Sequence, residues 1–95
     1  MSKFELGRVV VTREISEKME SDASFAAFLS KSMKRYMKCD WGDLPSKDKR
    51  ANNNALKTGE ERIMASYFYP ETGENIWIIT EWNRSATTIL FPDEY

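Results

Sequence analysis

The chain of 95 residues contains no histidine and a single cysteine, Cys39. Histidine is the usual general base near neutral pH and the commonest metal ligand, so its absence excludes most acid–base mechanisms and ordinary zinc sites. One thiol cannot form an internal disulfide, which is typical of a protein of the reducing cytoplasm. Cys39 would be a nucleophile only if Lys38 or Arg35 lowered its pKa, and an inert structural thiol is the simpler interpretation.

Other common signatures are also missing. The four glycines are scattered along the chain, so there is no glycine-rich phosphate loop and no nucleophile elbow. No apolar run approaches the roughly 20 residues that span a bilayer, and the first ten residues, MSKFELGRVV, lack the apolar segment of an export signal. We therefore expect a cytoplasmic, non-enzymatic protein that needs no cofactor.

The composition is that of one folded globule. Apolar residues make up 41% of the chain and aromatic residues 13%, which is too high for a disordered segment, so residues 1–95 are expected to form a single domain. The formal net charge is only -1, but its distribution is uneven. Residues 31–50 carry seven basic and three acidic side chains, whereas residues 71–95 carry five acidic side chains and one basic. This asymmetry indicates either a partner surface or an ordinary solvated face.

The last twenty residues, IWIITEWNRSATTILFPDEY, contain the predicted core of the fold. Residues 76–80 and 87–91 are rich in β-branched and aromatic side chains, so both segments are predicted to be strands. Both alternating faces of residues 76–80 are apolar, which is typical of a central strand covered on both sides.

Two further strands and two helices complete the predicted architecture. Residues 8–12 and 62–69 are predicted strands, and the turn at residues 70–74 makes the second of them a hairpin with residues 76–80. Apolar positions at helical spacing predict a helix over residues 25–37 that begins after Ser21 or Asp22, and a weaker helix is predicted from about 47 to 57 with Ser46 as its N-cap. We expect an α+β domain of order β-α-α-β-β-β, with two to three helices on an antiparallel sheet of about four strands whose edge could support a homodimer.

Two groups of polar residues are candidate binding sites. The first combines Asp40 and Trp41 of a loop with Glu81, Asn83 and Arg84 of the last turn, where Glu81 and Arg84 are expected to pair. Trp41 is either a core anchor or an exposed recognition group. The second group is the basic face of the long helix, which carries Lys34, Arg35 and Lys38. The simpler alternatives are a well hydrogen-bonded turn and a solvated helix face.

The order of several motifs resembles a small bacterial family whose members are common on plasmids and integrative conjugative elements. The motifs cover nearly the whole chain: FELG at 4–7, DWGDL at 40–44, RIMASY at 62–67, IWIITE at 76–81, RS at 84–85, TTIL at 87–90 and PDEY at 92–95. Members often have a histidine before the Trp-Gly loop and an aspartate in place of Asn83, so an acid–base role at either position is not expected here.

The resemblance implies a function in the service of mobile DNA. We expect a non-enzymatic inhibitor of a host defence nuclease, most concretely an anti-CRISPR protein that binds a CRISPR effector or its guide-RNA complex. Acidic side chains would then mimic phosphates: Glu71, Glu74, Glu81, Asp93 and Glu94. The alternative is direct nucleic-acid binding, in which the basic residues between 31 and 50 meet phosphates and Tyr36 or Trp41 stacks on a base. A small enzyme built on Asp40 or Glu81 is the third possibility.

Overall fold

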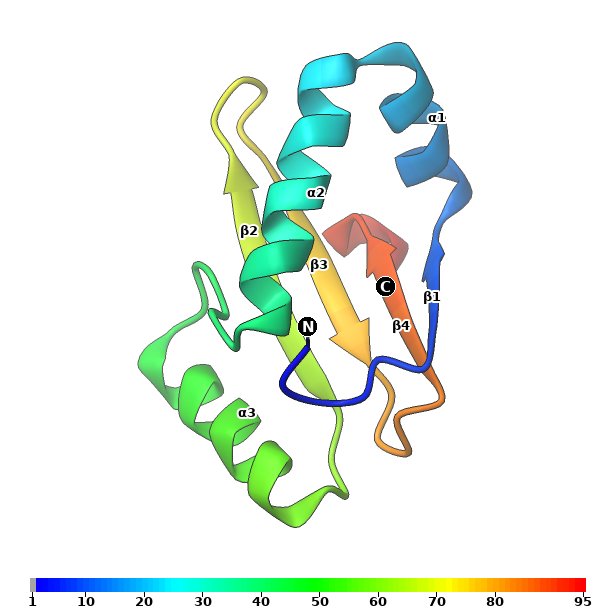
Figure 1. Ribbon diagram of the computed structural model, residues 1–95. Helices are drawn as coiled ribbons and strands as arrows, with labels where there is room; N and C mark the ends of the chain where they lie inside the picture. Colours follow the sequence, from blue (N-terminus) through cyan, green and yellow to red (C-terminus); the bar gives the residue numbers. More distant parts are fainter. Residues whose placement is uncertain (1) are drawn as a thin grey trace.

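The computed structural model describes residues 2–95, which form an α+β domain (Figure 1). Its elements in chain order are β1 (Arg8–Val11), α1 (Arg13–Ser21), α2 (Ala23–Met37), α3 (Ser46–Thr58), β2 (Ile63–Tyr69), β3 (Glu74–Thr80), β4 (Ala86–Leu90) and the 3-10 helix η1 (Pro92–Glu94). The predicted fold class and all four predicted strands are confirmed. The order contains one helix more than β-α-α-β-β-β, because residues 13–37 form two helices.

Those two helices meet at Asp22, which belongs to the end of one and the start of the other. Its backbone N–H donates to Lys18 O and closes α1, while its side chain accepts from Phe25 N and caps α2. A short carboxylate that accepts such a bond stabilises a helix N-terminus by about 1 kcal/mol. The predicted cap at residue 21 or 22 is therefore placed at Asp22.

The sheet has the strand order β1-β4-β3-β2, so β3 is central as predicted. The pairs β2/β3 and β3/β4 are antiparallel, but β1 lies parallel to β4, with Val10 opposite Thr88. The prediction of a purely antiparallel sheet is therefore wrong for its edge strand. β1 and β4 are far apart in sequence, and no local turn fixes the direction in which they pair.

One face of the sheet packs against α2 and holds the core (Figure 1). Phe25, Leu29 and Tyr36 of α2 are buried against alternate residues of the strands, including Tyr67 and Ile78. The opposite face carries Trp77 and is covered in part by the C-terminal Tyr95, whose ring lies 5.7 Å from the Trp77 ring between centroids. Trp77 is consequently half-buried, and the expectation that β3 is covered on both sides holds only in part.

A chain of hydroxyl groups crosses this core. The Tyr36 hydroxyl lies 2.7 Å from Thr80 Oγ1, which lies 2.7 Å from Thr87 Oγ1. Thr87 in turn donates to Leu6 O at 2.7 Å. All three hydroxyls are buried and paired, as buried polar groups must be if they are not to destabilise the fold.

The outer edge of β2 is closed by α3 and the loop before it. The side-chain amide of Asn52 donates to Met64 O at 2.6 Å and accepts from Met64 N at 3.2 Å, as a neighbouring strand would. Asp43 N donates to Ser66 O, and Asp43 Oδ2 accepts from Phe68 N. This edge is therefore closed to a further strand, and the predicted homodimer, if it forms through a sheet edge, is restricted to β1.

The sequence predicts α3 itself only in part. Gly59 ends the helix in a left-handed conformation, but Pro45 rather than the predicted Ser46 occupies the N-cap, without a side-chain bond. Ala51 is exposed, whereas Asn52 is buried although asparagine is a poor helix former. Within residues 2–95, no helix has the length and apolar character that a membrane span requires.

Candidate functional site

The first predicted site residue, Asp40, belongs to an ion-paired cluster at the end of α2. Its carboxylate accepts from Arg35 Nε at 2.7 Å and Nη2 at 3.2 Å, and also from Gly42 N. The hydrogen bonds from Arg35 hold the pKa of Asp40 below its usual value. The Arg35 guanidinium lies 5.0 Å from the centre of the Tyr67 ring, and Tyr67 donates to Asp40 O. Asp40 is thus a fixed anion that organises its loop, unsuited to act as a general acid.

Trp41 is a core anchor. Only 3% of its surface is exposed, its ring packs on Tyr36 and Phe4, and its indole N–H donates to Asn53 of α3. Tyr36 is fully buried as well. The expectation that either ring stacks on a nucleobase is therefore wrong, because neither ring has a face that solvent can reach.

Arg84 is a structural residue of the β3–β4 turn. Its guanidinium donates to four backbone carbonyls: Glu61 O at 2.7 Å, Trp82 O at 3.0 Å, Ala55 O at 3.1 Å and Glu81 O at 3.2 Å. These bonds join the turn to the C-terminal end of α3 and to the start of β2. The expected ion pair between Glu81 and Arg84 is not formed, since Arg84 contacts the backbone of Glu81 rather than its carboxylate. Asn83 stabilises the same turn, with its side chain accepting from Ser85 N.

The proposed polar site therefore divides into two parts. Asp40 lies beside Arg35 of α2, whereas Glu81 lines a pocket with residues of α3 and β2. α3 contacts both parts, because Asn53 binds Trp41 and Ala55 O binds Arg84. Among residues 2–95, no hydrogen bond joins Asp40 to Glu81, and Asp40 is not part of the pocket that Glu81 lines.

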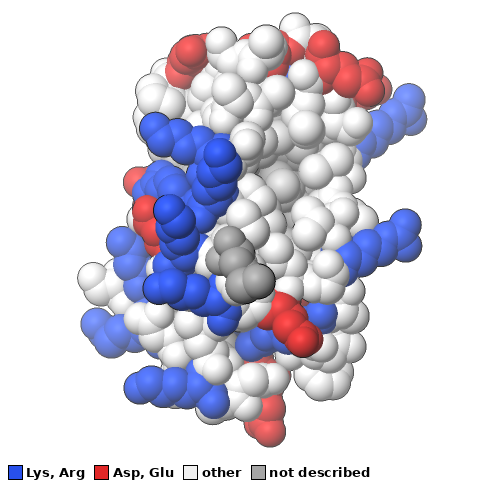
Figure 2. Space-filling view, viewed as in Figure 1, with Lys and Arg blue, Asp and Glu red and all other residues white. Residues whose placement is uncertain are grey.

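The basic residues, in contrast, gather on one surface. Figure 2 shows lysine and arginine side chains in a band over α2 and α3. We call this the basic face and define it by the residues Lys31, Lys34, Arg35, Lys38, Lys49 and Arg50. Lys49 of α3 also contributes to lowering the pKa of Asp40, which places it near the C-terminal end of α2. Among residues 2–95, Arg35 alone of this set forms an ion pair.

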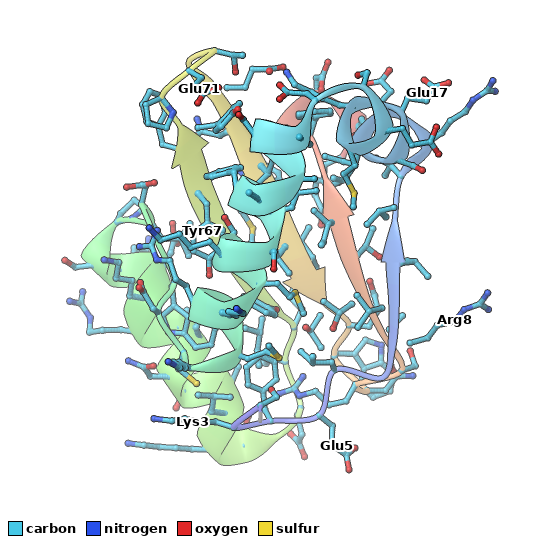
Figure 3. The ribbon with its side chains drawn as sticks, turned by 45° about the horizontal axis from the view of Figure 1, so that its top comes forward. Lys3, Glu5, Arg8, Glu17, Tyr67 and Glu71 are labelled. Atoms are coloured by element: carbon cyan, nitrogen blue, oxygen red, sulfur yellow. The ribbon has the colours of Figure 1, made fainter. Side chains whose placement is uncertain are left out.

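The acidic residues expected to mimic phosphates do not form a single surface. Glu74 is paired with Lys18, Glu71 accepts from the Tyr69 hydroxyl, and Glu94 accepts from Thr12 and from Phe91 N. Glu81 lies past the opposite end of β3 from Glu74. Part of the set does lie in an acidic region around α1 and the β2–β3 turn, where Glu71 and Glu17 lie at the end of the molecule remote from Lys3 (Figure 3).

A pocket of about 700 Å³ was not predicted from the sequence. It lies beside α3 on the sheet face opposite α2, and its wall includes Trp77, Trp82 and Tyr95 together with Asp48, Glu61 and Glu81. Trp82 and Tyr95 are 61% and 70% exposed. The one available signal was the pair of tryptophans around Glu81, but the other wall residues come from segments far apart in sequence.

The pKa values of the remaining reactive side chains do not favour their ionised forms. Burial raises the pKa of the Cys39 thiol, which opposes thiolate formation. Burial likewise raises the pKa values of Tyr36 and Tyr67, so both phenols stay neutral. Within residues 2–95, no three cysteine or carboxylate side chains are grouped closely enough to hold a metal ion. The described surface therefore provides a charged face and a pocket, both of which are suited to binding.

Comparison with protein-family models, with curated proteins and with solved structures found no match to this chain.

Proposed function

We propose that this protein is a non-enzymatic binding protein that contacts the phosphate backbone of a nucleic acid through its basic face. The observation that supports this proposal most strongly is the continuity of that face over two helices. Five of its six members (all except Arg35) have no carboxylate partner among residues 2–95, so their charges are free to meet phosphates. The rigid helices α2 and α3 fix their spacing, which reduces the entropy lost on binding.

The chemistry of the basic face favours recognition of the phosphate backbone of a nucleic acid rather than of its base sequence. Lysine acts as a point charge on phosphate, and Lys31, Lys34 and Lys38 follow one stripe of α2 at helical spacing. No aromatic ring belongs to this surface as defined, and Tyr36 and Trp41 beneath it are buried. Binding is therefore expected to depend on salt and to discriminate little between bases.

A salt titration tests this proposal. Fluorescence anisotropy with a labelled RNA strand of about 20 nucleotides should show binding that weakens steeply between about 50 and 200 mM salt. The double variant Lys34→Gln/Lys38→Gln removes two phosphate contacts and should reduce the slope of log K against log salt by between about one and two.

The matched control is Arg8→Gln/Arg13→Gln, which removes the same charge from the far side of the molecule. Arg8 points away from the domain beside β1 (Figure 3), and Arg13 is exposed. Equal weakening by the two double variants would show that only net charge matters and would contradict a specific basic face. Absence of any salt-dependent binding to RNA or duplex DNA would contradict the function itself.

The second candidate is the nuclease inhibitor expected from the resemblance. The observation that favours it is the separation of charge, with acidic residues at one end of the molecule and the basic face over α2 and α3 (Figures 2 and 3). A surface of this kind complements an assembly that presents both guide RNA and a basic protein channel. In this form of the proposal the basic face meets the guide RNA.

A pull-down with a purified CRISPR effector, with and without guide RNA, tests the second candidate beside a DNA-cleavage assay. We expect retention only of the guide-loaded effector and loss of cleavage, and we expect Lys34→Gln/Lys38→Gln to restore cleavage. Full cleavage with no retention, across several effector types, would refute the inhibitor proposal and leave nucleic-acid binding as the sole candidate.

A further inference from the structure

The pocket on the sheet face opposite α2 has aromatic walls that remain open to solvent. Trp77 extends from the central strand β3, Trp82 from the turn after it, and Tyr95 from the C-terminus. The rings of Trp77 and Tyr95 meet at an interplanar angle of 67°, which fixes Tyr95 at the side of the pocket. Aromatic faces carry negative potential and attract cations, tryptophan most strongly.

The carboxylates of the pocket add negative charge to the negative potential of its aromatic faces. Asp48, Glu61 and Glu81 line it, and among residues 2–95 none of these carboxylates forms an ion pair. Arg62 is the one basic residue that the described part of the chain places in the lining, and it is already engaged. It donates to the Tyr95 hydroxyl at 2.6 Å and lies over the Tyr95 ring. The amide of Asn52 is likewise committed to Met64. The groups left to bind a ligand are therefore carboxylates and indole rings.

We propose that this pocket binds an arginine side chain presented by a partner polypeptide. A guanidinium stacks on an indole face and donates hydrogen bonds to carboxylates in its plane, so it satisfies both kinds of wall at once. A nucleic acid is a poor occupant, because its phosphates would lie near three unpaired carboxylates. The pocket and the basic face are thus two distinct binding surfaces, one for a cation and one for phosphates.

The test uses the whole protein and two acetylated, amidated tripeptides, Gly-Arg-Gly and Gly-citrulline-Gly, which differ in charge but hardly in shape. The protein has three tryptophans, whose indole N–H signals are followed by NMR during the titration. We expect the arginine peptide to shift the signals of Trp77 and Trp82 and to leave buried Trp41 unchanged. The citrulline peptide should shift none of them.

Variants of the wall locate the site. Glu81→Gln and Asp48→Asn change exposed side chains without removing volume, and each should weaken binding of the arginine peptide by about threefold, as expected for a partly exposed ion pair. The matched control Glu20→Gln neutralises an exposed carboxylate of α1 and should leave the affinity unchanged.

Three results would overturn the proposal. Equal shifts with citrulline would show that charge plays no part, and equal weakening by Glu20→Gln would show attraction to the whole molecule rather than to the pocket. Shifts of Trp77 and Trp82 caused by adenosine monophosphate but not by the arginine peptide would assign the pocket to a nucleobase.

Discussion

The variant Gly42→Ala is expected to lose about 3 kcal/mol or more of the free energy of unfolding. Gly42 has a φ angle of +73°, a left-handed conformation that costs an alanine about 1–2 kcal/mol. A Cβ atom there would also lie 2.0 Å from Ser66 O and within 3 Å of the Tyr67 ring. The loop must therefore move away from β2 and lose its hydrogen bonds to Ser66.

Urea denaturation followed by circular dichroism measures this loss, and the chain supplies a matched control. Gly73 has a φ angle of +77°, but a Cβ atom there would meet nothing within 4 Å. Gly73→Ala should therefore cost only the conformational part, about 1 kcal/mol. Equal losses in the two variants would show that the contact of the Gly42 loop with β2 does not contribute to stability.

The second large effect is expected at Arg84. Replacement by alanine removes the four hydrogen bonds that the charged guanidinium donates, including the bond to Ala55 O at the C-terminal end of α3. We therefore expect the free energy of unfolding to fall by about 3 kcal/mol. Arg84 also has a positive φ angle of 61°. Arg84→Gly should consequently be about 1 kcal/mol more stable than Arg84→Ala, although it lacks the same bonds.

The same denaturation measurement distinguishes this role from a general effect of charge. Arg13→Ala removes an exposed arginine that pairs with Glu17 and should change stability by less than about 0.5 kcal/mol. If Arg84→Ala were as mild as Arg13→Ala, the guanidinium would be a surface group and the carbonyl contacts would be incidental.

Local chemistry predicts most of the secondary structure of this chain. The β-branched runs fix the strands, Asp22 and Gly59 mark helix boundaries, and the turn before Glu74 needs Gly73. These features depend on neighbours within a few residues, which the sequence displays directly. The parallel pairing of β1 with β4 depends instead on segments nearly eighty residues apart, as with Arg8 and Ala86, and no local pattern encodes it.

The candidate site was harder to predict for the same reason. The basic stripe of α2 follows from helical spacing alone. The partners of Arg84 are backbone carbonyls from three segments, and carbonyls have no signature in a sequence. Asparagine is a poor helix former, yet the amide of Asn52 replaces a missing strand neighbour for Met64. The aromatic pocket likewise draws its walls from α3, β2, β3 and the C-terminus, which only the folded chain brings together.

The hydroxyl chain through the core has a fixed direction. Thr87 donates its single hydroxyl proton to Leu6 O, so Thr80 donates to Thr87. Tyr36 then donates to Thr80 at 2.7 Å in preference to Ile63 O, which lies 3.3 Å from its hydroxyl. The segment before β1 is held further by Lys3 N, which donates to Met37 O, and by the Phe4 ring against Tyr36. The opening of residues 3–6 and the loosening of α2 from the sheet are therefore one cooperative event, and amide hydrogens in both segments should exchange with solvent through a common opening.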